Sequence, residues 1–113
     1  MHIYIAAEVL REKSEKSPWN YQNKLHLLEA EMFSAQRLKG RARISFNAAI
    51  TAARSSKFIH EQGLACELAA MHCVRYGDGI NARSFFNQAL ECYSKWGSQV
   101  KIDHINRQLE RLA

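Results

Sequence analysis

The sequence has few of the residues that form turns, and its cysteines are odd in number. One proline and five glycines in 113 residues are too few for the closely spaced turns of an all-β fold. The three cysteines lie in stretches with helical apolar spacing, which indicates buried, reduced thiols rather than a disulfide framework. These shortages favour an all-α protein in a cytosolic or nuclear compartment.

The chain also has no long apolar run. No segment approaches the roughly 20 apolar residues of a membrane-spanning helix. The apolar start, residues 1–7, has no basic segment and is followed by Glu8, so it does not resemble a secretory signal peptide. We expect a cytoplasmic protein without membrane association, and 113 residues suffice for one domain with its own core.

Acidic residues are missing from the middle of the chain. None lies between Met32 and His60, although that stretch holds six lysines and arginines. Four of them form a candidate anion patch: Arg37, Lys39, Arg41 and Arg43. Such a patch is either a solvated turn whose long side chains cover apolar neighbours, or a site for nucleic acid, an acidic peptide or anionic lipid. Because no aromatic residues alternate with these charges, we rank nucleic acid below a protein partner.

What the chain does contain is a repeat with a spacing of forty residues. Seven residues recur at this spacing: Leu28, Ala30, Ala42, Arg43, Phe46, Asn47 and Ala49 reappear as Leu68, Ala70, Ala82, Arg83, Phe86, Asn87 and Ala89. A fixed period of this size is typical of repeat arrays, in which each unit buries its apolar face against its neighbours. Such arrays usually bind other molecules rather than catalyse reactions.

Apolar periodicity and breaks predict six helices joined by short loops. We expect them at about 1–16, 18–38, 41–56, 59–76, 80–95 and 98–112. Lys39–Gly40 should end the second helix, because glycine is the usual left-handed terminator. Gly77–Gly79 and Gly97 should end the fourth and fifth. Short loops make consecutive helices pack antiparallel.

The spacing of alanine and phenylalanine resembles the tetratricopeptide repeat. It occurs twice, as Ala42, Phe46, Ala49 and as Ala82, Phe86, Ala89, with Ala30 and Ala70 twelve residues before each set. The period exceeds the roughly 34 residues of that family, and its consensus tryptophan and closing proline are missing. The resemblance implies an all-α, tetratricopeptide-like array of about six antiparallel helices in one domain, residues 1–113. Its parts would be an N-terminal helix (1–16), repeat 1 (18–56), repeat 2 (58–95) and a C-terminal capping helix (98–112).

Longer blocks resemble a narrower group of proteins. The blocks are Ser17–Tyr21, Leu27–Glu31, Phe58–Gln62, Leu64–Ala65, Glu67–Ala70 and Cys92–Gly97. Their order is similar to the helical-repeat region of very large signalling proteins that combine a serine/threonine kinase, an ATPase and a sensor histidine kinase. The resemblance implies a regulatory or scaffolding segment, either a fragment or a small relative of that region. None of the kinase or nucleotide-binding motifs of those proteins occurs in this sequence.

Residues that could carry chemistry do not form a recognisable site. Cys66 and Cys73 share a helix with His60 and His72, but seven residues place the two cysteines ~10 Å apart along the axis, and no Cys-x-x-Cys pair exists. No serine lies in a nucleophile elbow, and the glycines are not in a phosphate loop. We therefore expect no metal, no cofactor and no enzymatic activity.

In a stacked array, the first helix of each pair lines the concave face. This predicts a partner groove from the second and fourth helices: Lys24, Leu27, Glu31, Ser34, Leu64, Glu67, Met71 and Arg75. We expect a helical or extended peptide with a small apolar anchor, supplied by another protein or by other domains of a parent protein. An apolar end helix would also allow a homodimer. The function predicted is a non-catalytic interaction or scaffold module in signal transduction. The alternative is a basic module that binds nucleic acid or another polyanion through Arg37–Arg43.

Overall fold

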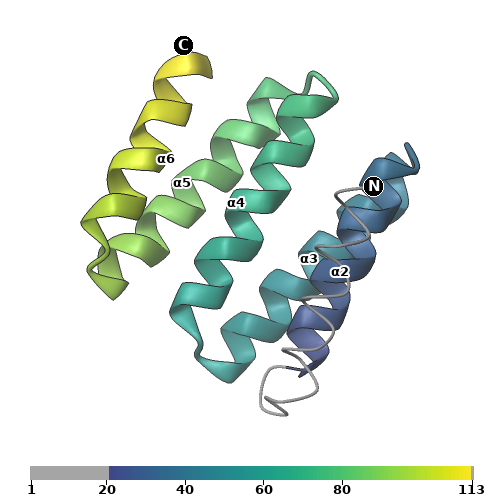
Figure 1. Ribbon diagram of the computed structural model, residues 1–113, viewed down its shortest axis with the longest axis horizontal. Coiled ribbons are helices and arrows are strands. Elements are labelled where there is room, and N and C mark those ends of the chain that lie inside the picture. The colour runs from purple at the N-terminus through teal and green to yellow at the C-terminus, as the bar shows by residue number, and fades with distance from the viewer. Residues whose placement is uncertain (1–20, 113) are drawn as a thin grey trace. The chain divides into compact units, whose positions relative to one another are not determined.

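A computed structural model describes residues 21–112, and every regular element in this range is a helix (Figure 1). The helices are α2 (Tyr21–Ala35), α3 (Lys39–Ser56), α4 (Ile59–Arg75), α5 (Gly79–Trp96) and α6 (Gln99–Leu112). The all-α class is therefore confirmed. The helix predicted at 1–16, and the expected start of the next helix at Ser17–Pro18, lie outside these residues.

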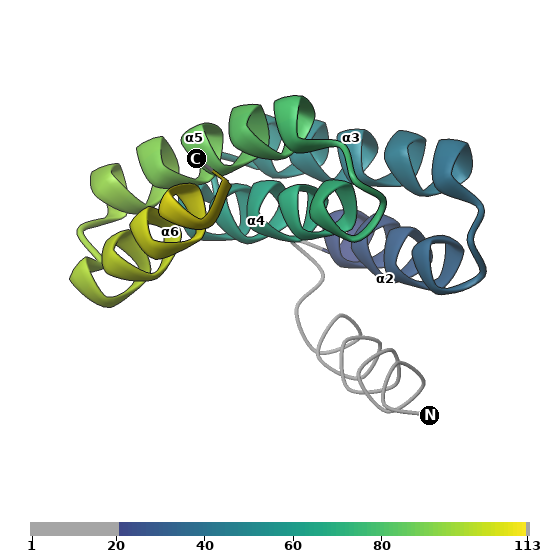
Figure 2. The ribbon, with the colours of Figure 1, turned by 90° about the horizontal axis from the view of Figure 1, so that it is seen from above.

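The chain divides into two compact units, residues 1–57 and 58–113. In the first unit, α2 packs against α3. In the second unit, α5 packs against both α4 and α6 (Figure 1). Seen from above, α4 and α6 lie on the same side of α5 (Figure 2). The boundary between the units coincides with the junction expected between repeat 1 and repeat 2.

The forty-residue spacing of the sequence recurs in the helix bounds. Helix α3 of the first unit occupies Lys39–Ser56, and α5 of the second unit occupies Gly79–Trp96. Likewise α4 begins at Ile59 and α6 at Gln99. Loops of the same length thus separate equivalent helices, and residues forty apart occupy equivalent positions.

The turns show the same forty-residue spacing. They also show that the predicted end of the helix at 18–38 is wrong. The left-handed residues of the turns after α2 and α4 are Arg37 (φ 64°) and Gly77 (φ 74°). The second helix therefore does not end at Lys39–Gly40, because these residues already belong to α3. The N–H groups of Arg37 and Leu38 bond back to the carbonyls of Ser34 and Phe33, at 3.1 and 2.9 Å. This closes the helix without glycine.

The alanines and phenylalanines that repeat in the sequence lie in the cores of both units. Phe46 and Phe86 are buried. The six small residues that flank them are fully buried too: Ala30, Ala42, Ala49, Ala70, Ala82 and Ala89. Alanine allows paired helices to approach closely, and each phenylalanine fills the space beside them.

Among the buried positions that differ between the repeats, three depend on one another in the second unit. Asn23, Leu27 and Ala53 of the first unit are replaced forty residues later by Gly63, Glu67 and Tyr93. A Cβ atom on Gly63 would lie 2.8 Å from Cε1 of Tyr93. Glycine therefore makes room for the tyrosine ring between α4 and α5.

Helix α6 lies forty residues after α4 in the repeat, but the face that is apolar and buried on α4 is polar and exposed on α6. Cys66 and Ala70, buried on α4, correspond to Asn106 and Glu110, which are exposed on α6. A further helix could not pack on this face of α6 without burying the amide of Asn106 and the carboxylate of Glu110. The polar face suits the capping role expected for residues 98–112.

Candidate functional site

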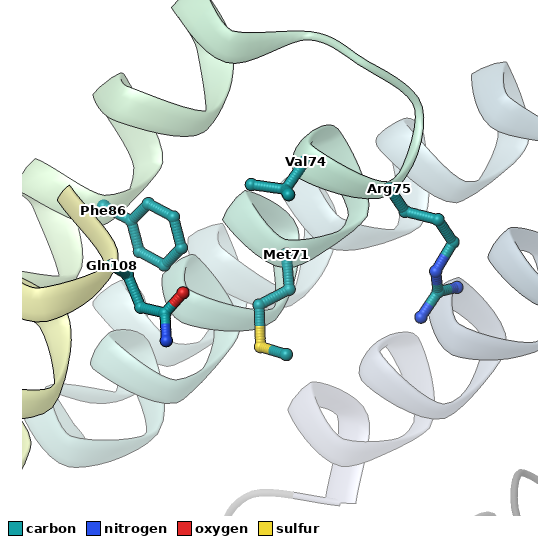
Figure 3. Close-up of a pocket in the computed structure, with 5 residues that line it drawn as sticks. All are labelled: Met71, Val74, Arg75, Phe86 and Gln108. Carbon is teal, nitrogen blue, oxygen red and sulfur yellow. The ribbon is translucent and has the colours of Figure 1, made fainter. Parts of the chain in front are cut away.

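A pocket of about 240 Å³ lies in the second unit. Its walls are Met71, Val74 and Arg75 of α4 and Gln108 of α6, and Phe86 of α5 lines it as well (Figure 3). This volume is below the ~300–1,000 Å³ of pockets for drug-sized ligands. The pocket therefore suits one side chain of a partner better than a complete small molecule.

Two apolar side chains at the pocket remain open to solvent. Met71 is 46% exposed and Val74 is 47% exposed, whereas Phe86 is buried. In Figure 3, the side chain of Val74 extends towards the ring of Phe86, and Arg75 extends away from both. Apolar atoms exposed beside a hollow are typical of interaction sites, because their burial by a partner is favourable.

A buried carboxylate joins the three helices one turn before the pocket. Glu67 of α4 accepts a hydrogen bond from the hydroxyl of Tyr93 (2.8 Å) and one from Nζ of Lys101 (3.4 Å), both at Oε1. Nε2 of His104 lies 3.4 Å from its Oε2. The Lys101 ammonium also lies over the ring of Tyr93, 5.5 Å from its centroid. We call these four residues the Glu67 cluster.

The environment of Tyr93 keeps its hydroxyl protonated. Burial, together with the hydrogen bond and the negative charge of Glu67, raises the pKa of Tyr93 well above its ordinary value. The phenol is therefore a hydrogen-bond donor at physiological pH. It holds Glu67 in place and is not a general base.

The predicted groove residues are placed in three different environments. Leu27, Ser34 and Glu67 are buried and offer no open surface. Lys24, Glu31 and Leu64 are half-buried, whereas Met71 and Arg75 are exposed. Only Met71 and Arg75 of the eight line the pocket.

Sequence reasoning missed Phe86 and Gln108 as pocket residues, and Lys101 and His104 as partners of Glu67. On α6, the signal is a polar spacing at 101, 104, 108 and 111, one position before the apolar spacing at 102, 105, 109 and 112. The signal that could have revealed Glu67 is its alignment with Leu27, since a carboxylate at an apolar repeat position needs partners.

The candidate anion patch surrounds the turn between α2 and α3. Arg37, Lys39 and Arg41 are exposed, and Arg43 is half-buried. The first turn of α3 holds no acidic residue, and Leu38 at its N-cap provides no side-chain hydrogen bond. A helix N-terminus carries partial positive charge. The cationic side chains of the patch add to this positive potential, which attracts anions.

The cysteines and the possible metal ligands are the remaining groups that could carry chemistry. Cys66, Cys73 and Cys92 form no disulfide bonds and are buried, as expected. Within residues 21–112, no three histidine, cysteine or acidic side chains are grouped so that they could hold a metal ion. None of the five helices α2–α6 is long and apolar enough to cross a membrane.

Comparison of this chain with protein-family models, with curated proteins and with solved structures finds no match.

Proposed function

We propose that this chain is a non-catalytic helical-repeat module that binds a protein or peptide partner. The observation that carries the proposal is the pair of half-exposed apolar side chains, Met71 and Val74, beside the pocket over Phe86. An apolar anchor entering this pocket would bury both side chains. Each Å² of apolar surface buried contributes about 25 cal/mol.

The proposed architecture is a tetratricopeptide-like array of about six helices. Helix bounds and left-handed turn residues that recur after forty residues support it. With the block resemblances of the sequence, we propose a regulatory or scaffolding segment of a cytoplasmic signalling protein. Its partner is another protein or another domain of a parent chain.

The experiment is selection of peptides from a random library displayed on phage, with the whole chain as bait. We expect enriched peptides to share one apolar side chain. Met71→Glu should weaken their binding at least tenfold, because it places a charge at the pocket edge. The matched control is Ile80→Glu, at an apolar residue of α5 that is 86% exposed and does not line the pocket.

Circular dichroism of both variants should match that of the parent chain, since both side chains are substantially exposed. The proposal fails if no peptide is enriched. It also fails if Ile80→Glu and Met71→Glu weaken binding equally.

The second candidate function is polyanion binding at Arg37–Arg43. The specific observation in its favour is the exposure of Arg37, Lys39 and Arg41 around one turn. A fluorescent oligonucleotide titrated at increasing salt would test it. Affinity should fall steeply with salt and with Arg41→Glu if the patch binds phosphates; peptides bound at Met71 should be unaffected by Arg41→Glu.

A further inference from the structure

Helix α6 turns a stripe of polar residues, mostly basic, towards the groove beside α4. Lys101, His104, Gln108 and Arg111 are spaced three, four and three residues apart, which places them on one side of the helix. Lys101 and His104 contact Glu67 of α4, and Gln108 lines the pocket. Arg111 is exposed one turn beyond Gln108. Because Lys101 and His104 face the carboxylate of Glu67, Arg111 provides the positive charge at this edge of the pocket.

The opposite wall of the groove offers a partner no open carboxylate among the residues that the structure describes. On α4 the residues at this face are Leu64, Glu67, Met71 and Arg75. The only acid among them, Glu67, is buried and accepts hydrogen bonds from Tyr93 and Lys101. Its charge is thus compensated inside the protein.

The acidic residues of α6 lie on a different side of the helix. Asp103 and Glu110 are seven residues apart, and both are exposed. Asp103 accepts a hydrogen bond from Nε2 of Gln99 at 2.9 Å. Asp103 and Glu110 therefore lie with Arg107 on one side of α6, whereas Lys101, His104 and Arg111 lie on the side of Gln108, the residue of α6 that lines the pocket (Figure 3).

We propose that the pocket between α4 and α6 binds an acidic peptide segment of a partner protein, with one apolar side chain in the pocket and its carboxylates beside Arg111. This inference rests on the proposed function and names the chemistry of the partner. The apolar anchor supplies most of the affinity. The carboxylates supply specificity and faster association, and arginine can hold a carboxylate with two parallel hydrogen bonds.

The arginines at this site also have a structural role, and the experiment has to separate that role from peptide binding. Arg75 and Arg111 lie in the last turns of α4 and α6, where cations also interact favourably with the partial negative charge of a helix C-terminus. Charge reversal at Arg111 therefore lowers stability slightly in any case. For this reason the experiment measures which peptide is preferred and does not rely on stability.

The probes are three fluorescent peptides of about ten residues, each with one leucine flanked by glutamates, by serines or by lysines. Fluorescence anisotropy with the whole chain should give a dissociation constant for the glutamate peptide about tenfold below that of the serine peptide. The lysine peptide should bind most weakly. Raising the salt from about 0.05 M to 0.5 M should narrow the difference, because exposed charges are then screened.

Two charge-reversal variants make the test specific. Arg111→Glu should remove the preference for the glutamate peptide and leave binding of the serine peptide unchanged. Arg83→Glu is the matched control, because Arg83 is an exposed arginine of α5 in the same unit and does not line the pocket. It should retain the preference. Equal binding of the glutamate and serine peptides, or an equal effect of both variants, would overturn the inference.

Failure of this inference can be told apart from failure of the proposed function. If the serine or lysine peptide binds best and Met71→Glu weakens it, the module binds peptides and only the acidic partner is wrong. If none of the three peptides binds and phage selection enriches none, both are wrong. Sedimentation that shows a dimer dissociated by Met71→Glu would mean that a second copy fills the groove, which also overturns the acidic partner.

Discussion

Arg37 and Gly77 occupy equivalent turns but differ in what their backbone conformation costs. Both have positive φ, 64° and 74°. The left-handed region costs a residue with a side chain about 1–2 kcal/mol, and costs glycine little. The first turn thus keeps a strained arginine in the anion patch, where the second has the residue best suited to the conformation.

We predict that Arg37→Gly stabilises the protein by about 0.5–1 kcal/mol, because the relief of strain exceeds the greater entropy of glycine in the unfolded chain. The reciprocal change, Gly77→Ala, should destabilise it by about 1 kcal/mol. Urea unfolding followed by circular dichroism measures both. Shifts of the same sign in the two variants would contradict the prediction.

At the scale of the elements, the Glu67 cluster determines how α4, α5 and α6 are held together. A buried carboxylate left without donors is costly, whereas one that is hydrogen-bonded and paired is tolerated. Tyr93 from α5 and Lys101 and His104 from α6 provide those partners. The cluster also positions Gln108 one turn along α6, and so helps to form the pocket.

The raised pKa of Tyr93 predicts how stability depends on pH. The folded phenol ionises at higher pH than the unfolded one, whose pKa is about 10. Its contribution is therefore fully present below about pH 10 and is lost as the pH rises above that value. At pH 7, Tyr93→Phe should cost about 1 kcal/mol, because Glu67 loses a donor.

Urea unfolding from pH 7 to about pH 11.5 tests this expectation. The stability of the parent chain should approach that of Tyr93→Phe as the pH passes 10, since only the parent loses the contribution of the phenol. All other titrating groups are common to both chains. A difference that stays constant over the whole range would contradict the assignment.

At the scale of the molecule, the division into two units raises the question whether one unit folds in the absence of the other. Residues 58–113 form a compact unit of three helices with Phe86, Tyr93 and Ile105 buried. Its polar α6 face requires no further helix. Repeat arrays, by contrast, often need each neighbour for stability.

We predict that residues 58–113, produced alone, fold cooperatively but with low stability, of about 2–4 kcal/mol, because so short a chain buries little surface. Circular dichroism and a dispersed amide NMR spectrum would show folding. Ile105→Ala should unfold this fragment, since removing a buried isoleucine side chain costs about 2–5 kcal/mol. Val100→Ala, at a residue that is 79% exposed, is the control and should change little. An unfolded parent fragment would mean that the second unit depends on the first.

Much of the fold could be predicted from local patterns. Apolar residues three and four apart define the helices, and the recurrence of Ala42, Phe46 and Ala49 as Ala82, Phe86 and Ala89 locates the core. The predicted end of α2 at Lys39–Gly40 is wrong because the helix stops without a glycine, at a turn where Arg37 adopts the left-handed conformation. Local sequence predicts such a turn poorly when the usual residue is absent.

The sequence by itself determined the all-α class, the forty-residue period and the buried alanines and phenylalanines, because these depend on residues close together in the chain. Only the tertiary structure decided which of the predicted groove residues are accessible and what surrounds them. Met71 and Gln108 line the same pocket, and Glu67 pairs with Lys101, although more than thirty residues of sequence separate the two members of each pair. Such contacts arise from the way three helices pack, and helical periodicity defines the faces of one helix without saying which faces meet.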